Sequence, residues 1–166
     1  RSAVLYGGML IAAGHFSLAV PAPTMFYLGL VSIVLGTGLL KPNISVIVGQ
    51  LYEARDIRRD AGFSVFYMGI NLGALLGPLI TGYLAQDPGF RASVQGWGFD
   101  PNSVWHFGFG AAGVGMTLGL LQYVLTGRNL GSAGLAPGGA TTPELAARFR
   151  RQALVWGGAA MAVLVV

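Results

Sequence analysis

Long apolar stretches alternate with short polar ones along this chain, and the alternation predicts membrane-spanning helices. No charged residue occurs from Ser2 to Leu40, and only a Pro-rich turn at residues 21–24 interrupts that run. About 20 apolar residues are enough for a helix to cross a bilayer. We therefore predict four spans, over residues 3–20, 25–51, 61–85 and 104–126.

The polar segments between these spans differ in their arginine content, which predicts the side that each one faces. Three arginines lie in residues 53–60, and four more follow the last span: Arg128, Arg148, Arg150 and Arg151. The polar loop that we expect at residues 86–103 holds only Arg91. Because cytoplasmic loops are enriched in Lys and Arg, we place residues 53–60 and 127–151 in the cytoplasm and residues 86–103 outside. Asp60 is the expected N-cap of the third span.

The segment after the fourth span has the composition of a linker followed by a new helix. Residues 128–142 are rich in Gly and Ala, and we predict a cytoplasmic linker there. Thr142-Pro143-Glu144 combines a capping hydroxyl, a proline at the first helical position and an early acid, so residues 143–166 should begin a further helix. The chain starts with Arg1 and stops within an apolar run, so we expect an internal fragment of a longer protein, with its other helices missing here.

Composition supports an all-α membrane protein and excludes several functions. Hydrophobic residues make up 54% of the chain and charged residues 10%, where soluble domains carry roughly 25% charge. The mean hydropathy is +0.64. The net charge of +4 follows from loop arginines, so we expect a bilayer and no nucleic acid as partner. The chain has no cysteine and two isolated histidines, His15 and His106, so we expect no metal and no cofactor. Without a nucleophile–base or carboxylate pair, we do not expect an enzyme.

One lysine, Lys41, is the only charged residue of the second predicted span. An ionisable group at bilayer depth costs at least ~2.5–3.5 kcal/mol and usually faces a partner or a cavity. Lys41 should lie about 16–18 Å from the cytoplasmic loop, near the midplane. We expect it to face an acidic group or a solute carboxylate from outside this chain; the alternative is that its stem reaches an interface.

The third predicted span has two distinct faces. At 100° per residue Tyr67, Asn71 and Pro78 form one stripe, and Gly69, Gly73 and Gly77 lie opposite. The glycines are typical of tight helix packing, to which we also assign Pro78. Asn71 then faces either a solute cavity or another helix through a hydrogen bond, and helix geometry leaves both open. Because Asn71 lies at the same predicted depth as Lys41, the two are candidates for one midplane solute site.

These residues resemble a known family. Residues 38–50 and 60–85 are similar to the fourth and fifth helices of the proton-dependent oligopeptide transporters of the major facilitator superfamily. Phe66, Tyr67, Ile70, Asn71 and Gly73 fill the F-Y-x-x-I-N-x-G signature of that family. Residues 105–116 look like its sixth helix and residues 6–15 like its third.

The resemblance implies a twelve-helix fold, of which this chain supplies helices three to six of the amino-terminal six-helix bundle. Residues from Pro143 onward would then begin a helix inserted between the two halves or, alternatively, helix seven. It implies symport of protons with di- and tripeptides in a multi-pass protein of the cell membrane, in bacteria the inner membrane. The lysine matching Lys41 engages a first-helix glutamate and the peptide carboxylate, and so couples proton movement to substrate. The residues matching Tyr67 and Asn71 line the peptide site.

Two alternatives remain open from the sequence. A relative within the family could carry nitrate or another small anion, since a lysine suits any anion. A protein of a different class, outside transport, could use Lys41 structurally.

Overall fold

The computed structural model describes residues 1–53, 55–135, 143–144, 147–148, 150–152 and 154–155. These residues fall into two units, Arg1–Gly134 and Leu135–Val166, each of which is considered by itself. The described residues of the second unit between 143 and 155 are helical, and the helix that we expect over residues 143–166 stays a prediction. The remainder of that predicted helix, and residues 136–142 of the predicted linker, lie outside the described residues.

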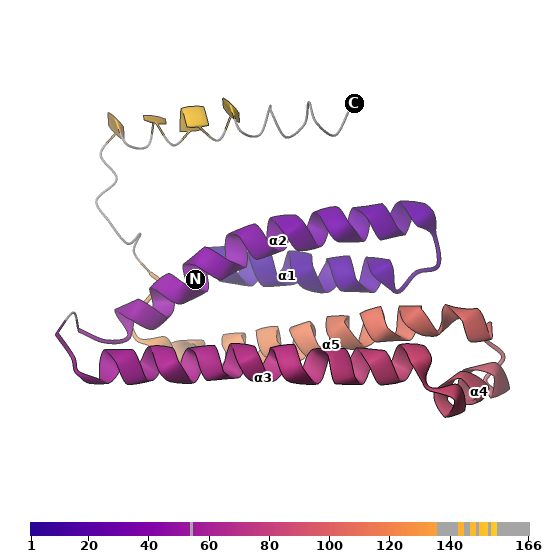
Figure 1. Cartoon of the computed structure of the whole chain (residues 1–166). Coiled ribbons are helices and arrows are strands. Elements are labelled where there is room, and N and C mark those ends of the chain that lie inside the picture. Colours follow the sequence, from indigo (N-terminus) through magenta and orange to yellow (C-terminus); the bar gives the residue numbers. More distant parts are fainter. Residues whose placement is uncertain (54, 136–142, 145–146, 149, 153, 156–166) are drawn as a thin grey trace. The chain divides into compact units, whose positions relative to one another are not determined.

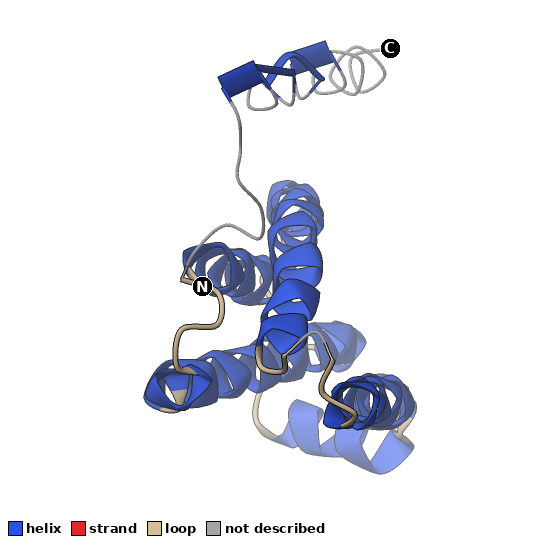
Figure 2. Cartoon of the chain, turned by 90° about the vertical axis from the view of Figure 1, so that its left-hand side faces the viewer, coloured by secondary structure: helices blue, strands red, loops and turns tan. Residues whose placement is uncertain are grey.

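The first unit is a bundle of helices without strands among its described residues (Figures 1 and 2). Its long helices are α1 (Ser2–Leu18), α2 (Pro23–Gln50), α3 (Arg58–Gln86) and α5 (Val104–Leu125). Helix α1 packs along α2 on one side and α5 on the other, and α3 packs along α5 (Figure 1). Three helical segments, 23–50, 59–86 and 101–125, are long and apolar enough to cross a membrane, and α1 is a shorter apolar helix.

Glycines let α1 and α2 approach until their backbones touch. A Cβ on Gly7 would lie 2.7 Å from the carbonyl oxygen of Gly36, and a Cβ on Gly14 would lie 2.8 Å from that of Gly29. Each pair is reciprocal, because a Cβ on Gly36 would lie 2.5 Å from the Gly7 oxygen and one on Gly29 2.7 Å from the Gly14 oxygen. Both helices space these glycines seven residues apart, so two matched contacts run along one antiparallel seam.

The predicted outer loop is wrong in part, because residues 88–96 form a short helix, α4 (Pro88–Gly96). A 3₁₀ turn, η1 (Pro101–Ser103), then leads into α5. The Asp87 carboxylate accepts a hydrogen bond from the Phe90 backbone N–H at 2.7 Å, and Pro88 occupies the first turn. This is the start pattern that we recognised at Thr142-Pro143, so the signal for α4 was present in the sequence.

The start of α3 also differs from the prediction. The helix begins at Arg58 with Ile57 at the N-cap, so Asp60 lies inside the first turn rather than at the cap. The capping side chain is that of Asp56, whose carboxylate accepts from the Arg58 backbone N–H at 2.8 Å. A negative charge within the first turn still interacts favourably with the helix dipole.

The segment after α5 is packed onto the first unit, although we expected a linker from residue 128. It forms a 3₁₀ turn, η2 (Gly127–Leu130), and Ala133 is buried in a small core with Val4 and Ile47. The Arg1 side chain donates from Nε to the Ala133 carbonyl at 2.8 Å, and Gly134 N–H donates to the Gln50 side chain at 2.6 Å. Residues 128–134 are therefore part of the bundle.

Candidate functional site

Lys41 lies in the interior of α2, on a part of the helix whose backbone is partly opened by a proline. The Lys41 side chain is exposed. Pro42 follows inside the helix and has no N–H to donate to the carbonyl four residues earlier. Two side chains donate hydrogen bonds to nearby backbone carbonyls. The Asn43 amide donates to the Leu39 carbonyl at 2.8 Å, and the Ser45 hydroxyl donates to the Lys41 carbonyl at 3.2 Å.

No carboxylate pairs with Lys41 in the described part of the chain. The one ion pair there joins Arg58 to Asp56 at 2.9 Å, in the segment between α2 and α3. Arg58 donates its hydrogen bonds to the Asp56 carboxylate and holds the pKa of that acid below its ordinary value. Lys41 is thus an exposed cation on an apolar helix, which is the state that we expect if its partner comes from another segment or from a solute.

Tyr67 and Asn71 are both exposed on α3, and Tyr67 belongs to a small group of rings. The Tyr67 side chain is 57% exposed. Its ring centroid lies 5.6 Å from that of Phe66 and 6.5 Å from that of Phe63. Among the described residues no side chain hydrogen-bonds the Asn71 amide, so the alternative of a bond to another helix has no partner within these four helices.

The structure does not bring Lys41 into contact with Tyr67 or Asn71. Helices α2 and α3 contact each other near the segment that joins them, where Gly49 faces Arg59 and Phe63 and the Tyr52 ring covers Gly62. Away from this junction the two helices diverge (Figure 1). The three predicted site residues therefore stand exposed on two neighbouring helices, and their assembly into one site stays a prediction.

The glycines that we expected to pack α3 meet no neighbour within the described chain. A Cβ added to Gly69, Gly73 or Gly77 would find no atom within 4 Å. A packing role for these glycines therefore needs a helix from outside the described residues and stays a prediction. Pro78 lines a cavity of about 450 Å³ beside α5, together with Thr81, Gly108 and Phe109.

Sequence reasoning missed the glycines that do form close contacts. Besides the α1–α2 seam, Gly8 faces Leu120 of α5, and a Cβ on Gly113 would lie 3.0 Å from the Phe16 ring. The seven-residue spacing of Gly7 and Gly14 and of Gly29 and Gly36 is the sequence signal that could have identified the seam.

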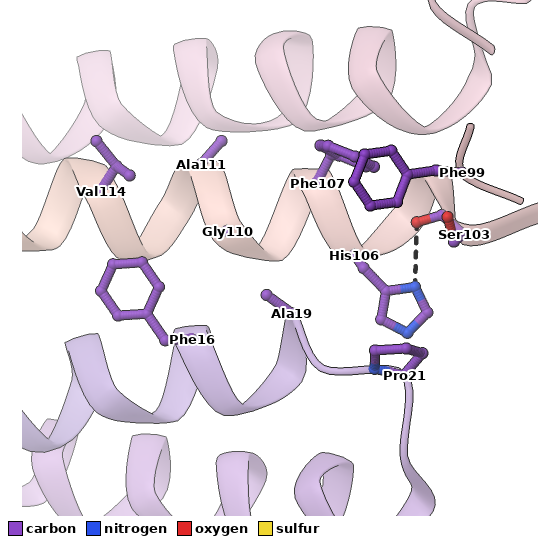
Figure 3. A pocket seen from close by; sticks show the side chains of 10 residues that line it. All are labelled: Phe16, Ala19, Pro21, Phe99, Ser103, His106, Phe107, Gly110, Ala111 and Val114. Carbon is purple, nitrogen blue, oxygen red and sulfur yellow. Dashed lines mark hydrogen bonds between the residues drawn. The ribbon is translucent and has the colours of Figure 1, made fainter. Parts of the chain in front are cut away.

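Among the cavities between the helices are two that Lys41, Tyr67 and Asn71 do not line. The first, of about 430 Å³, lies between the end of α1 and the start of α5, and apolar side chains such as Phe16, Phe107 and Val114 line most of it (Figure 3). His106 in its wall lies 3.1 Å from the Ser103 carbonyl oxygen (Figure 3). The cavity beside Pro78 includes His15, whose buried Nδ1 has no hydrogen-bond partner in the described part of the chain.

Comparison with known proteins gives a consistent result. Residues 1–135 match the family described as PTR2: POT family. The chain is 48% identical over 139 residues to a di-/tripeptide transporter of Lactobacillus helveticus, covering 82% of this chain and 27% of that protein. It is 49% identical over 126 residues to the peptide transporter YePEPT of Yersinia enterocolitica, covering 74% of this chain and 22% of that protein. The chain thus spans about a quarter of the length of the curated relatives that it matches.

Solved structures agree with this assignment. The fold matches a crystal structure of the peptide transporter POT in complex with alafosfalin, with a TM-score of 0.74 and 45% identity over 98% of this chain and 31% of the other. It also matches a POT family transporter in complex with a thioalcohol-conjugated peptide, with a TM-score of 0.75 and 39% identity over 100% of this chain and 31% of the other. Together with the apolar helices, these matches identify a multi-pass membrane protein, and the chain belongs to the POT family of the major facilitator superfamily.

Proposed function

We propose that the protein carrying this chain is a proton-coupled symporter that imports di- and tripeptides by alternating access. The observation that carries the proposal is the exposed Lys41, which lies in the interior of an apolar helix and has no carboxylate partner among the described residues. A cation that lies at the depth of the bilayer core and has no protein partner is suited to bind a solute carboxylate in a water-filled site at the midplane. Relatives named di-/tripeptide transporter support peptides as the solute.

The three site residues take different roles in this proposal. Lys41 binds the peptide carboxylate and, when the site is empty, an acidic side chain of another helix, so that protonation of that acid is linked to substrate binding. Asn71 accepts a hydrogen bond from the peptide amino terminus through its amide oxygen, and Tyr67 lines the site. Tyr67 and Asn71 support these roles by being exposed one helical turn apart on α3.

We also propose the surroundings of the site. The segments 53–60 and 127–151 face the cytoplasm, residues 86–103 face outward, and the protein lies in a bacterial inner membrane. The bilayer, protons and further helices of the same protein are its partners. Seven arginines on the proposed cytoplasmic segments, against one in residues 86–103, support this orientation.

The test is dipeptide-driven acidification of the cytoplasm in cells that express the full-length protein. We expect that adding a dipeptide lowers the cytoplasmic pH and that the same dipeptide accumulates against its gradient. Addition of nitrate serves as the control, because a lysine also suits a small anion. Acidification by nitrate and none by di- or tripeptides would replace the proposed substrate class, and no response to either would remove the proposal of proton coupling.

A further inference from the structure

The short helix α4 has its two ends fixed by its own sequence. At its start Asp87 accepts from the Phe90 N–H at 2.7 Å. At its end Gly98 adopts φ +85°, its N–H donates to the Gln95 carbonyl at 3.0 Å, and the Phe99 N–H donates to the Val94 carbonyl at 3.1 Å. This pair of bonds around a left-handed glycine is a Schellman motif. Both ends of this nine-residue helix are thus capped by hydrogen bonds, which stabilise it against unwinding.

Aromatic rings attach one face of α4 to the ends of the apolar helices. The Phe90 ring lies 6.2 Å from Tyr83 in the last turn of α3 and 5.7 Å from Phe107 in the first turn of α5. Trp97 lies 6.1 Å from Phe90, and Phe99 lies 5.9 Å from Phe107. We call these five rings the aromatic rim: Tyr83, Phe90, Trp97, Phe99 and Phe107. Because Val94 on the same face of α4 is fully buried, the helix lies on the span ends with its apolar side.

Much of the aromatic rim is nevertheless uncovered. Trp97 is 61% exposed, Tyr83 58% and Phe99 56%. Leu79 and Ile80, one turn before Tyr83 on α3, are exposed as well. Arg91 and Gln95 are exposed on the other face of α4. The helix is therefore amphipathic and lies where the exposed apolar surface of α3 ends.

We propose that α4 and the turn through Phe99 lie in the headgroup layer of the bilayer at this end of the spans, with the aromatic rim touching lipid and the polar face of α4 touching water. Trp and Tyr are enriched at this depth because each ring has an apolar body and a polar tip. An amphipathic helix with its apolar face turned to the acyl boundary is stable in the same layer. The proposal concerns the lipid partner of the outer segment and does not depend on which solute is carried.

The experiment measures the depth of spin labels on the full-length protein, freed of its own cysteines and reconstituted in phospholipid vesicles. One label replaces Trp97, a second replaces Phe99, and a matched control replaces Ala92 on the polar face of the same helix. Each label is tested for collision with oxygen, which concentrates in lipid, and with a water-soluble nickel chelate. Phe99→Cys serves as the independent position if Trp97→Cys loosens the aromatic rim.

We expect the labels at 97 and 99 to collide more with oxygen than with the nickel chelate, and the label at Ala92 to show the reverse. Low accessibility to both reagents at 97 and 99 would mean that another part of the protein covers the aromatic rim, and would overturn the proposal. High accessibility to the nickel chelate at both positions would place the aromatic rim in water and overturn it equally.

Discussion

Helix α2 packs tightly against α1 and loosely against α3, and the difference separates the scaffold from the candidate site. Along the α1 side, Gly29 and Gly36 bring the backbones into contact. On α3, a Cβ on Gly69, Gly73 or Gly77 would meet nothing in the described chain. Lys41 lies about 140° around α2 from Gly36 and so points away from the seam. The tightly packed α1–α2 pair thus carries Lys41, the one Lys or Arg within these two helices, on a side that the described chain leaves uncovered.

Replacing Lys41 on the exposed side of α2 should have the largest effect on transport. Lys41→Ala in the full-length protein should abolish uphill, proton-driven peptide uptake, because it removes the cation that we propose binds the peptide carboxylate. Accumulation of a labelled dipeptide under an imposed pH gradient measures this, and counterflow under equal proton concentrations should partly survive. Arg55→Ala, an exposed arginine outside the spans, is the control and should accumulate peptide normally. Normal accumulation by the lysine variant would refute the assigned role of Lys41.

Disturbing the glycine contact between α1 and α2 should lower the stability of the protein rather than its coupling of protons to peptide. Gly36→Ala places a methyl group against the Gly7 carbonyl, and such overpacking costs about 1–3 kcal/mol. Gly38→Ala is the matched control two residues away, where a Cβ meets nothing within 4 Å. Thermal unfolding of the two purified variants in detergent should show a lowered midpoint for the first alone. Equal unfolding midpoints would mean that α1 and α2 can move apart to make room for the methyl group without loss of stability.

The same comparison explains what the sequence could and could not predict. The long helices follow from apolar length, and Lys41, Tyr67 and Asn71 were selected by the cost of polar groups within apolar helices. The G-x-x-x-G pattern directed attention to Gly69, Gly73 and Gly77, whose packing role stays a prediction, whereas the close contacts within the described chain belong to Gly7, Gly14, Gly29 and Gly36. A single helix cannot reveal which of its small-residue faces meets a neighbour, since the neighbour lies elsewhere in the chain or outside it.

The segments outside the spans were predicted less well, for a local reason. We expected a loop at residues 86–103 from its Gly and Pro content, yet Asp87 and Pro88 start a helix and Gly98 ends it. Residues 128–134 pack on the bundle because Arg1 and Gln50, more than 80 residues away, bond to them. Such long-range bonds cannot be read from local composition.

Gly73→Leu tests whether a helix outside the described residues closes the open side of α3. In the full-length protein we expect a lower yield of folded transporter, since a leucine at a tight helix contact overpacks by about 1–3 kcal/mol. Size-exclusion profiles of the detergent-extracted protein measure this, with Gly115→Leu on α5 as a comparison at another glycine that meets nothing in the described chain. A normal profile for Gly73→Leu would show that this face meets lipid or water instead.

Asn71→Ala should weaken peptide binding without loss of folded protein. One amide bonded to a peptide ammonium contributes about 1–2 kcal/mol, which corresponds to roughly a tenfold change in affinity. Competition by unlabelled dipeptide against a labelled one gives the affinity. Ser64→Ala is the control, because the Ser64 hydroxyl bonds only to the Asp60 carbonyl of its own helix at 2.9 Å. Unchanged affinity for Asn71→Ala would favour the alternative, in which Asn71 hydrogen-bonds another helix.

The smallest expected effect on stability comes from a substitution in the segment that joins α2 to α3. Arg58 bonds to the Asp56 carboxylate and lowers the pKa of that acid from its ordinary value of 3.8. A lowered pKa means that the contribution to stability is complete above the ordinary value and disappears as the pH falls through the pKa of the folded state. Asp56→Asn keeps an oxygen to accept from the Arg58 N–H but carries no charge. We therefore expect the variant to be slightly less stable than the wild type at neutral pH, and the difference to vanish in strong acid. Thermal unfolding at both pH values measures it, and a gap that widens on acidification would contradict the role of this ion pair at the start of α3.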